Sequence, residues 1–325
     1  MNIAVLLANM GGPDSLEAVE PFLFQIFSDP HIIDVSMPGF ARRMMAKMIA
    51  RKRKDESIEI YRKLGGKTPL HKIMREQAQA LQRTLNDGAD KGKQFHVFPA
   101  NRYGRPSLQS VLDDIHRDGY ERLIVLSMYP FFATSTSGSI DSEIQRLTKK
   151  LSIPAERITY IERYGERQDF VRLTAGHIVR QLNEFPQNEK NELTLLLSAH
   201  SIPQRHLQKG DPYFDEVRLA VQRLQKELPE RVTVHLAFQS KIGPVKWLEP
   251  ATDEKILELA GAGLSRLFVY PLGFTADNSE TVYEIGMLYR DLALQHGIKE
   301  FVRLKALNSE PDFINLLAQL VRENV

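Results

Sequence analysis

LTLLLSAHSIP, residues Leu193–Pro203, joins a short apolar run to a small polar loop that ends in proline. Apolar runs of this length are typical of strands that are buried on both faces of a parallel sheet. LLANMGGP, residues Leu6–Pro13, has the same layout near the start of the chain. The two stretches predict equivalent strands in two parts of the protein.

Two further pairs of segments repeat in the same order. FHVFPANRYGRP at Phe95–Pro106 resembles VHLAFQSKIGP at Val234–Pro244, and ERLIVLSMYPFFATSTSGS at Glu121–Ser139 resembles SRLFVYPLGFTADNSE at Ser265–Glu280. Short strands that alternate with amphipathic helical stretches are typical of βαβ units. We therefore predict an α/β fold of two similar Rossmann-like domains, each a parallel sheet flanked by helices. Loops at the carboxyl ends of the strands would border an interdomain cleft.

The expected elements follow from apolar periodicity. The predicted buried strands are Ile3–Ala8, Phe95–Phe98, Leu123–Met128, Leu193–Ser198, Val232–Phe238 and Leu267–Pro271. The predicted amphipathic helices are Met74–Leu85, Ser107–Arg117, Tyr213–Lys226 and Asp253–Ala262. The predicted domains are an N-terminal one at 1–150, a C-terminal one carrying the acid and base residues at 151–308, and a helix at 309–325 that packs back on the first. Lys149–Arg157 is the expected crossover between the halves.

Composition excludes several classes of protein. The 325 residues carry a formal net charge of +2, so the chain lacks the strongly basic character of a nucleic-acid-binding domain. With no cysteine, it forms no disulfide, cysteine-ligated zinc site or iron–sulfur cluster of the usual type. The N-terminus lacks the pattern of a signal peptide, and no stretch approaches the roughly 18 apolar residues of a membrane span. The expected location is the cytoplasm.

His200 is the first candidate for chemistry. It follows the apolar run Leu193–Ser198, in a loop stiffened by Pro203. A neutral imidazole accepts protons near physiological pH and binds divalent metals. The alternative is a histidine that only caps the end of the strand through local hydrogen bonds.

Three carboxylates follow the last predicted buried strand, in GFTADNSETVYEI at Gly273–Ile285. Asp277, Glu280 and Glu284 have the spacing i, i+3, i+7, which places them along one face of an α-helix. Such a row can attract a hard divalent cation or pass protons, and crowding raises the pKa of its members. The alternative is a capping box from Asp277 to Glu280, which leaves Glu284 unexplained.

The first half of the chain carries apolar and aromatic side chains where the second carries ionisable ones. Met10 stands where the second half has His200. A flat hydrophobic ligand could lie against such a surface. The same side chains can equally build an ordinary core, and the pattern leaves both interpretations open. The aromatic candidates are Tyr61, Tyr103, Tyr129, Phe131 and Phe132.

Gly39–Lys54, GFARRMMAKMIARKRK, combines helix-forming residues, methionines and basic charge. A basic amphipathic helix can lie on an anionic membrane surface. The alternative is a surface helix whose apolar stripe covers the core while its basic face lies in water. The sequence does not choose between a lipid-facing or ligand-facing lip and this second arrangement.

Seven stretches are distinctive when taken together. They are LLANMGGP at 6–13, YRKLGGKTPL at 61–70, NRYGRP at 101–106, YPFFATSTSGS at 129–139, LSAHSIP at 197–203, KIGPVKWLEPATDE at 241–254 and GFTADNSETVYEI at 273–285. In this order, and with the histidine and the acidic row both present, they resemble the ferrochelatase family of enzymes, which insert ferrous iron into a porphyrin. The resemblance covers most of the chain and implies two Rossmann-like domains with a cleft between them.

The resemblance also assigns roles to individual residues. His200 matches the essential histidine of the family, and Glu280 matches the carboxylate paired with it across the porphyrin; both are the expected metal ligands. Asp277 and Glu284 match an acidic path for protons or metal that leads away from Glu280. The residues expected to bind porphyrin are Met10, Tyr61, Arg102, Tyr103 and Trp247.

The resemblance implies porphyrin and Fe²⁺ as substrates, with no prosthetic group. Some members carry an iron–sulfur cluster on cysteines, which this chain lacks. Lys67, Thr68 and Ala276 depart from the usual family motifs without removing a reacting group. The absence of a targeting peptide points to the bacterial soluble type, cytoplasmic, with 39–54 as the expected contact if it meets the inner membrane face. The oligomeric state stays open.

The expected function is insertion of Fe²⁺ into protoporphyrin IX with release of two protons to give protohaem, the terminal step of haem biosynthesis. One alternative keeps the chemistry but changes the substrate to coproporphyrin, or to another tetrapyrrole and metal. A second is a non-catalytic porphyrin or haem carrier, for which an acidic row beside His200 would serve no purpose. His200 and the carboxylates do not by themselves select a metal.

Overall fold

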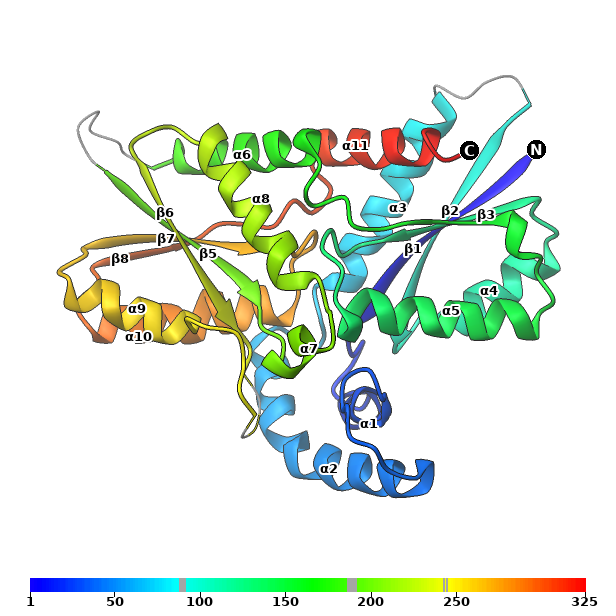
Figure 1. The fold of residues 1–325 in the computed structure, drawn as a ribbon, viewed down its shortest axis with the longest axis horizontal. Coiled ribbons are helices and arrows are strands. Elements are labelled where there is room, and N and C mark those ends of the chain that lie inside the picture. Colours follow the sequence, from blue (N-terminus) through cyan, green and yellow to red (C-terminus); the bar gives the residue numbers. More distant parts are fainter. Residues whose placement is uncertain (88–91, 186–191, 242, 244) are drawn as a thin grey trace. The chain divides into compact units, whose positions relative to one another are not determined.

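The computed structural model describes residues 1–87, 92–185, 192–241, 243 and 245–325, which form two compact units (Figure 1). The first unit comprises Met1–Glu162 and Ser309–Val325, and the second comprises Arg163–Asn308. The second unit is therefore inserted into the first.

The first unit is built on a parallel sheet of four strands in the order β2-β1-β3-β4. Helices α3 and α11 lie on one side of this sheet, and α4 and α5 lie on the other (Figure 1). Its strands are β1 (Asn2–Gly11), β2 (Gln94–Tyr103), β3 (Arg122–Ser127) and β4 (Ile158–Ile161). Its helices are α1 (Val19–Ser28), α2 (Gly39–Lys63), α3 (Leu70–Asp87), α4 (Leu108–Arg117), the π-helix η1 (Thr134–Gly138), α5 (Ser139–Lys150), the 3₁₀ helix η2 (Ala155–Arg157) and α11 (Pro311–Arg322).

The second unit repeats this plan, with a parallel sheet in the order β6-β5-β7-β8. Helices α6 and α8 cover one side of the sheet, and α9 and α10 cover the other (Figure 1). Its strands are β5 (Leu193–His200), β6 (Val232–Gln239), β7 (Arg266–Leu272) and β8 (Glu300–Arg303). Its helices are α6 (Gln168–Leu182), α7 (Gln204–Gln208), α8 (Tyr213–Glu227), α9 (Thr252–Gly261), the π-helix η3 (Glu280–Tyr289) and α10 (Arg290–Gln295).

The predicted fold class is confirmed, and so is the internal repeat. Leu6 pairs with Val125 in the first sheet and Leu196 pairs with Val269 in the second, which is the alignment that the sequence repeat gives. A π-helix follows the third strand of each unit. The two halves therefore share strand order, register and a rare helix type at the same place.

The match between the second strands was two residues out of register. Phe95 pairs with Ile3, and it is Val232, not Val234, that pairs with the equivalent Leu193. A shift of two residues keeps every side chain on the same face of a strand, so the apolar pattern cannot detect it.

The first unit extends beyond the expected boundary at residue 150. The Lys149–Arg157 segment does not cross between the halves; it closes α5 and leads into β4, which pairs with β3. Both β4 and β8 were absent from the expected strands because they are four-residue edge strands, and most of their side chains are only half-buried. Residues 309–325 belong to the first unit, where α11 packs against α3.

Close packing around the end of β1 explains the paired glycines of its motif. Gly11 has a φ of +94°, and a Cβ there would lie 2.1 Å from the carbonyl oxygen of Tyr103. At Gly12 a Cβ would lie 2.8 Å from Thr68 Cγ2. Only glycine allows β1 to leave the sheet so close to its neighbours.

Among the described residues, no helix is both long and apolar enough to cross a bilayer.

Candidate functional site

His200 is the last residue of β5, at the carboxyl edge of the second sheet. The loop that follows is fixed on both sides: the amide N–H of Ser201 donates to the carbonyl of Gln239, and its hydroxyl accepts from the amide of Leu248. The imidazole packs edge-on against Phe274, with 6.3 Å between ring centroids. His200 is thus held by a rigid strand and an aromatic neighbour.

Glu280 is the side chain that His200 meets. His200 Nδ1 lies 3.0 Å from Glu280 Oε2, and the two side chains are 34% and 37% exposed. Glu280 opens the π-helix η3, where Asn278 Oδ1 accepts hydrogen bonds from the amides of Glu280 and Thr281. The side chain of Asn278, one residue before the N-cap Ser279, therefore satisfies these amides, and the alternative capping box from Asp277 to Glu280 does not form.

Ser240 is a site residue that the sequence analysis missed. It follows β6 directly, with a φ of +69° that is uncommon for a residue with a side chain. Its amide and hydroxyl donate to the two carboxylate oxygens of Glu284, at 2.9 and 2.5 Å, and the hydroxyl also lies 3.5 Å from Glu280 Oε2. The rule that drew attention to His200, a polar residue just after a buried strand, also applies to Ser240.

The π-helix brings Tyr289 to Glu284. The Tyr289 hydroxyl donates to Glu284 Oε1 over 2.7 Å, a pairing of residues five apart that suits the i→i+5 hydrogen bonding of a π-helix. The sequence spacing assumed an α-helix, in which residues three and four apart are neighbours. The chain of contacts in the structure runs from His200 through Glu280 and Ser240 to Glu284 and Tyr289.

The two carboxylates have pKa values displaced in opposite directions. Burial raises the pKa of Glu280, but the charge and hydrogen bond of His200, with Ser240, outweigh it and leave the pKa below its usual value. Burial and the charge of Glu280 raise the pKa of Glu284 above its usual value, against the hydrogen bonds from Ser240 and Tyr289. Neighbouring titratable groups whose pKa values are shifted in opposite directions are typical of acid–base sites.

The charge state of His200 is set by the same neighbours. Burial lowers its pKa, but the charge and hydrogen bond of Glu280, with the charge of Glu284, raise it further. The net pKa lies above the usual value for histidine. The contact with Glu280 therefore stabilises the imidazolium that forms when His200 takes up a proton.

Asp277 is directed away from this chain of contacts. Its Oδ1 accepts from Arg303 Nη1 and from the Thr281 hydroxyl, at 2.7 and 2.8 Å, and its Oδ2 accepts from Asn308 Nδ2 at 2.9 Å. Arg303 reaches it across Gly286, where a Cβ would lie 3.1 Å from Arg303 Cδ. The structure brings Glu280 and Glu284 together at Ser240 and places Asp277 in a separate ion pair.

Arg102 and Tyr103 lie in the first unit and share the carboxylate of Asp29. Arg102 Nη2, the Tyr103 hydroxyl and the Ser139 hydroxyl all donate to Asp29 Oδ2, at 2.8, 2.7 and 2.6 Å. Burial raises the pKa of Asp29, but these hydrogen bonds, with one from the His31 amide and the charge of Arg102, bring it down to about 2. The network ties the end of α1 to β2 and the start of α5.

The other residues expected to bind porphyrin, Met10, Tyr61 and Trp247, make packing and backbone contacts within their own units. Met10 packs at the edge of the first unit's core, and Tyr61, near the end of α2, is buried. Trp247 lies in the second unit, where it forms a backbone bridge with Pro203 and its carbonyl accepts from Gln204 Nε2. The expected motif at 241–254 includes residues 242 and 244, which lie outside the described residues.

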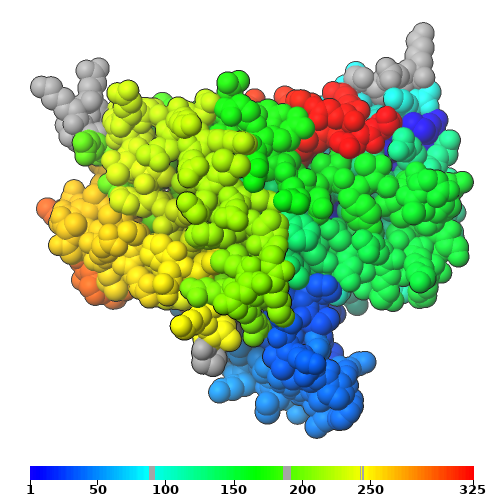
Figure 2. Space-filling model, viewed as in Figure 1, coloured from blue at the N-terminus to red at the C-terminus, as the bar shows by residue number. Residues whose placement is uncertain are grey.

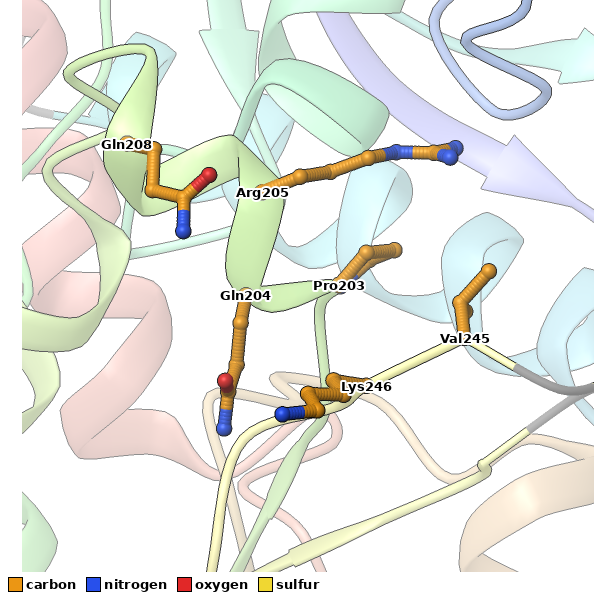
Figure 3. A pocket seen from close by; sticks show the side chains of 6 residues that line it. All are labelled: Pro203, Gln204, Arg205, Gln208, Val245 and Lys246. Atoms are coloured by element: carbon orange, nitrogen blue, oxygen red, sulfur yellow. The ribbon is translucent and has the colours of Figure 1, made fainter.

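A cavity of about 180 Å³ lies beside the His200 loop. In Figure 3 the side chain of Gln204 extends downward, that of Lys246 to the left and that of Arg205 to the right. Ligand pockets usually measure about 300–1,000 Å³, so this cavity is too small for a porphyrin. It is lined by Pro203, Gln204, Arg205, Gln208, Val245 and Lys246.

Solved structures with the same fold are chelatases. SirB from Bacillus subtilis with Fe³⁺ has a TM-score of 0.57 at 14% identity, covering 99% of this chain and 95% of that one. CbiX, described as the terminal enzyme for biosynthesis of sirohaem in denitrifying bacteria, has a TM-score of 0.51 at 12% identity, covering 100% of both chains. These likenesses show that the chain has the two-domain α/β fold of these structures.

Sequence comparison gives the family. The family model described as ferrochelatase matches residues 2–325. A ferrochelatase of Geotalea uraniireducens is 41% identical over 99% of this chain and 98% of its own length, and one of Aquifex aeolicus is 38% identical over 100% of both. The chain belongs to the ferrochelatase family and is an enzyme, a lyase that inserts a metal into a porphyrin.

Proposed function

We propose that this chain inserts Fe²⁺ into protoporphyrin IX in the cytoplasm, releasing two pyrrole protons and giving protohaem. The single observation that carries the proposal is the 3.0 Å contact between His200 Nδ1 and Glu280 Oε2. A histidine oriented by a carboxylate is a general base whose tautomer is fixed, which is what removal of a pyrrole proton requires.

The first proton is assigned to His200. Because Nδ1 is directed at Glu280, the other ring nitrogen, Nε2, is the one that accepts the pyrrole proton. The resulting imidazolium is stabilised by the negative charge of Glu280, whose pKa lies below its usual value. Base and counter-charge are therefore in place before the substrate binds.

Protons then leave through the carboxylates. Ser240 contacts both Glu280 and Glu284, and its hydroxyl can accept from one while it donates to the other. Glu284 has the higher proton affinity of the two, because its pKa is raised while that of Glu280 is lowered. We assign Glu284 as the next proton acceptor and Tyr289 as the group that holds it in place.

Fe²⁺ enters this scheme as a substrate. His200 and Glu280 offer one nitrogen and one oxygen donor to a passing ion, and two released protons balance its two positive charges. The pyrrole lone pairs lie in the plane of a flat porphyrin, so the ring must bend before the metal can bind. Binding energy from the ring faces and propionates would supply this distortion. The proposed contacts are Met10, Tyr61, Arg102, Tyr103 and Trp247.

The test is anaerobic mixing of the purified chain with Fe²⁺ and either protoporphyrin or coproporphyrin, with Zn²⁺ as an air-stable control. The porphyrin absorption bands report conversion to the metalloporphyrin. Catalytic turnover with protoporphyrin that is lost in His200→Ala, while porphyrin still binds, would support the proposal. His296→Ala, a substitution at an exposed histidine of the same unit, is the matched control.

Other outcomes would redirect the assignment. Turnover with coproporphyrin alone would retain the chemistry and change the substrate. Tight binding of both porphyrins without conversion would favour a carrier. Substantial turnover by His200→Ala would show that another group removes the pyrrole proton.

A further inference from the structure

Three buried polar side chains lie near the carboxyl edge of the second sheet. Ser198, Gln239 and Thr252 are all fully buried, in β5, in β6 and at the start of α9. The outer side of α9 forms part of the yellow to gold surface at the left of Figure 2, whereas Thr252 lies beneath it. Buried polar groups cost free energy unless they are hydrogen-bonded, so these three have to satisfy one another.

The three side chains form one directional chain of hydrogen bonds. Ser198 Oγ donates to Gln239 Oε1 over 2.7 Å and lies 2.8 Å from Thr252 Oγ1. A serine hydroxyl carries a single proton. Because that proton is used on Gln239, the Thr252 hydroxyl is the donor to Ser198. The chain of bonds therefore runs from the start of α9 across β5 to the last residue of β6.

Gln239 is the residue directly before Ser240. Its carbonyl accepts a hydrogen bond from the amide of Ser201, in the loop that follows β5. The amide of Phe238 donates to the carbonyl of Pro250, just before α9. The end of β6 is thus held by β5 on one side and by the α9 segment on the other, through both backbone and side chains.

Lys241, directly after Ser240, also contacts the first turn of α9. Its Nζ lies 3.0 Å from Glu254 Oε1 and 3.6 Å from Asp253 Oδ1. These ion pairs are exposed to solvent, and such pairs contribute little to stability. Residues on both sides of Ser240 are therefore linked to the start of α9, and the buried link is the stronger restraint.

The contacts of Ser240 depend on this restraint. Its φ of +69° is unfavourable for a residue with a side chain and persists only where the surrounding structure holds it. In this conformation its amide and hydroxyl both reach Glu284, and its hydroxyl also reaches Glu280. Hydrogen bonds weaken steeply as their geometry is lost, so a small rotation of the backbone would separate Ser240 from the carboxylates.

We propose that Thr252 is a positioning residue for metal insertion. Through Ser198 and Gln239 it holds the end of β6, and this keeps the Ser240 hydroxyl in contact with the two carboxylates of the proton path. Thr252 itself touches neither the substrate nor the reacting atoms. The inference rests on the proposed function, in which protons leave through Ser240.

The experiment starts from Thr252→Val, which removes the hydroxyl with little change in shape. We expect kcat for metal insertion to fall by at least about threefold and KM for porphyrin to stay within about twofold, because the variant leaves the substrate contacts in place. Thr252→Ser keeps the hydroxyl and should restore most of kcat. Thr174→Val is the matched control, at a buried threonine of α6 whose hydroxyl donates to the Phe170 carbonyl, and it should leave kcat unchanged.

A second measurement does not require turnover. The Ser240 amide donates to Glu284 Oε1 over 2.9 Å, so its hydrogen exchange reports whether Ser240 is held in place. Exchange of this amide should be at least about fivefold faster in Thr252→Val and unchanged in Thr174→Val. In a Ser240→Ala background, Thr252→Val should lower kcat by less than about twofold further, because both substitutions act through the same hydroxyl.

Three results would overturn the proposal. They are unchanged kcat and unchanged Ser240 exchange in Thr252→Val, an equal loss of kcat in Thr174→Val, and a loss from Thr252→Val that keeps its full size in the Ser240→Ala background. If the wild type inserted no metal into either porphyrin, the proposed function would fail. The exchange rate of the Ser240 amide would then still support or exclude its positioning by Thr252.

Discussion

His200 Nδ1 lies 3.0 Å from Glu280 Oε2, although the two residues are 80 positions apart in the chain. One stands at the end of β5 and the other at the start of η3, which follows β7, the strand paired with β5. The parallel pairing of neighbouring strands therefore sets the distance between base and carboxylate. Glu280 raises the pKa of His200, and His200 lowers the pKa of Glu280.

Glu280→Gln should lower the pKa of His200. The carboxylate raises that pKa through its charge and hydrogen bond, so its removal leaves the opposing effect of burial. The measurement is an NMR titration of the His200 ring signal, identified by its loss in His200→Ala. Glu258→Gln, at an exposed residue of α9, should leave the titration in place. An unchanged His200 pKa in Glu280→Gln would contradict the pairing.

Ser240→Ala should reduce kcat by about tenfold and raise the pKa of Glu284 further, because the hydroxyl that stabilises the ionised carboxylate is lost. Stability should fall by about 1 kcal/mol, the usual net value of one hydrogen bond. Steady-state kinetics and urea unfolding measure the two effects.

Ser240→Gly distinguishes chemistry from backbone strain. It also removes the hydroxyl, but glycine accepts the φ of +69° more readily. We expect the kcat of Ser240→Gly to match that of Ser240→Ala, with a higher unfolding midpoint. If Ser240→Gly restored kcat, the relay through the hydroxyl would be wrong and the strain would be the relevant property.

Asp277→Ala should destabilise the second unit by about 3 kcal/mol, because it leaves the guanidinium of Arg303 largely buried without its carboxylate. Thermal unfolding of the variant, of Arg303→Met and of the double variant would give the coupling between the two residues. Asp277→Asn tests the acidic path separately. A fall in kcat of more than about tenfold with an unchanged unfolding midpoint, on the order of 1.4 kcal/mol in the barrier, would place Asp277 in that path.

Asp29→Asn should make the free energy of unfolding less dependent on pH below about pH 5. The pKa of Asp29 is about 2 in the folded chain, below the usual value near 3.8, so the carboxylate stabilises the fold above about pH 4 and this contribution, about 2 kcal/mol, is lost as the pH falls towards 2. Urea unfolding between pH 5 and pH 3 would show a smaller change in the variant than in the wild type.

Arg102→Met is the companion to that experiment. The arginine donates to Asp29 and is also a proposed contact of the porphyrin, so we expect lower stability and a rise in KM for porphyrin of more than about threefold. Lower stability with an unchanged KM would show that the guanidinium holds Asp29 and does not bind the substrate.

The sequence predicted the parts of the fold that depend on buried apolar runs. Residues 3–8 and 193–198 lie within β1 and β5, and the repeat of these runs predicted two parallel sheets. Strands β4 and β8 were not predicted, because a four-residue, half-buried strand has no distinctive hydrophobic periodicity. The interdomain cleft stays a prediction.

The site was predictable in its residues but not in its geometry. His200, Glu280 and Glu284 were identified from position and charge, and the structure places them in one chain of contacts. Asp277 was grouped with them because the spacing assumed one α-helix through all three, whereas η3 begins only at Glu280 and Arg303 binds Asp277. No local sequence pattern predicts a π-helix, and the contact of Arg303 with Asp277 joins residues 26 positions apart in the chain.

The return of residues 309–325 to the first unit has a consequence for synthesis on the ribosome. Domains generally fold as units in the order in which they emerge. Here Arg163–Asn308 is contiguous and can close as soon as it has been translated, whereas the first unit lacks the helix that packs on α3 until 309–325 follow. The half that is translated first is thus the half that is completed last.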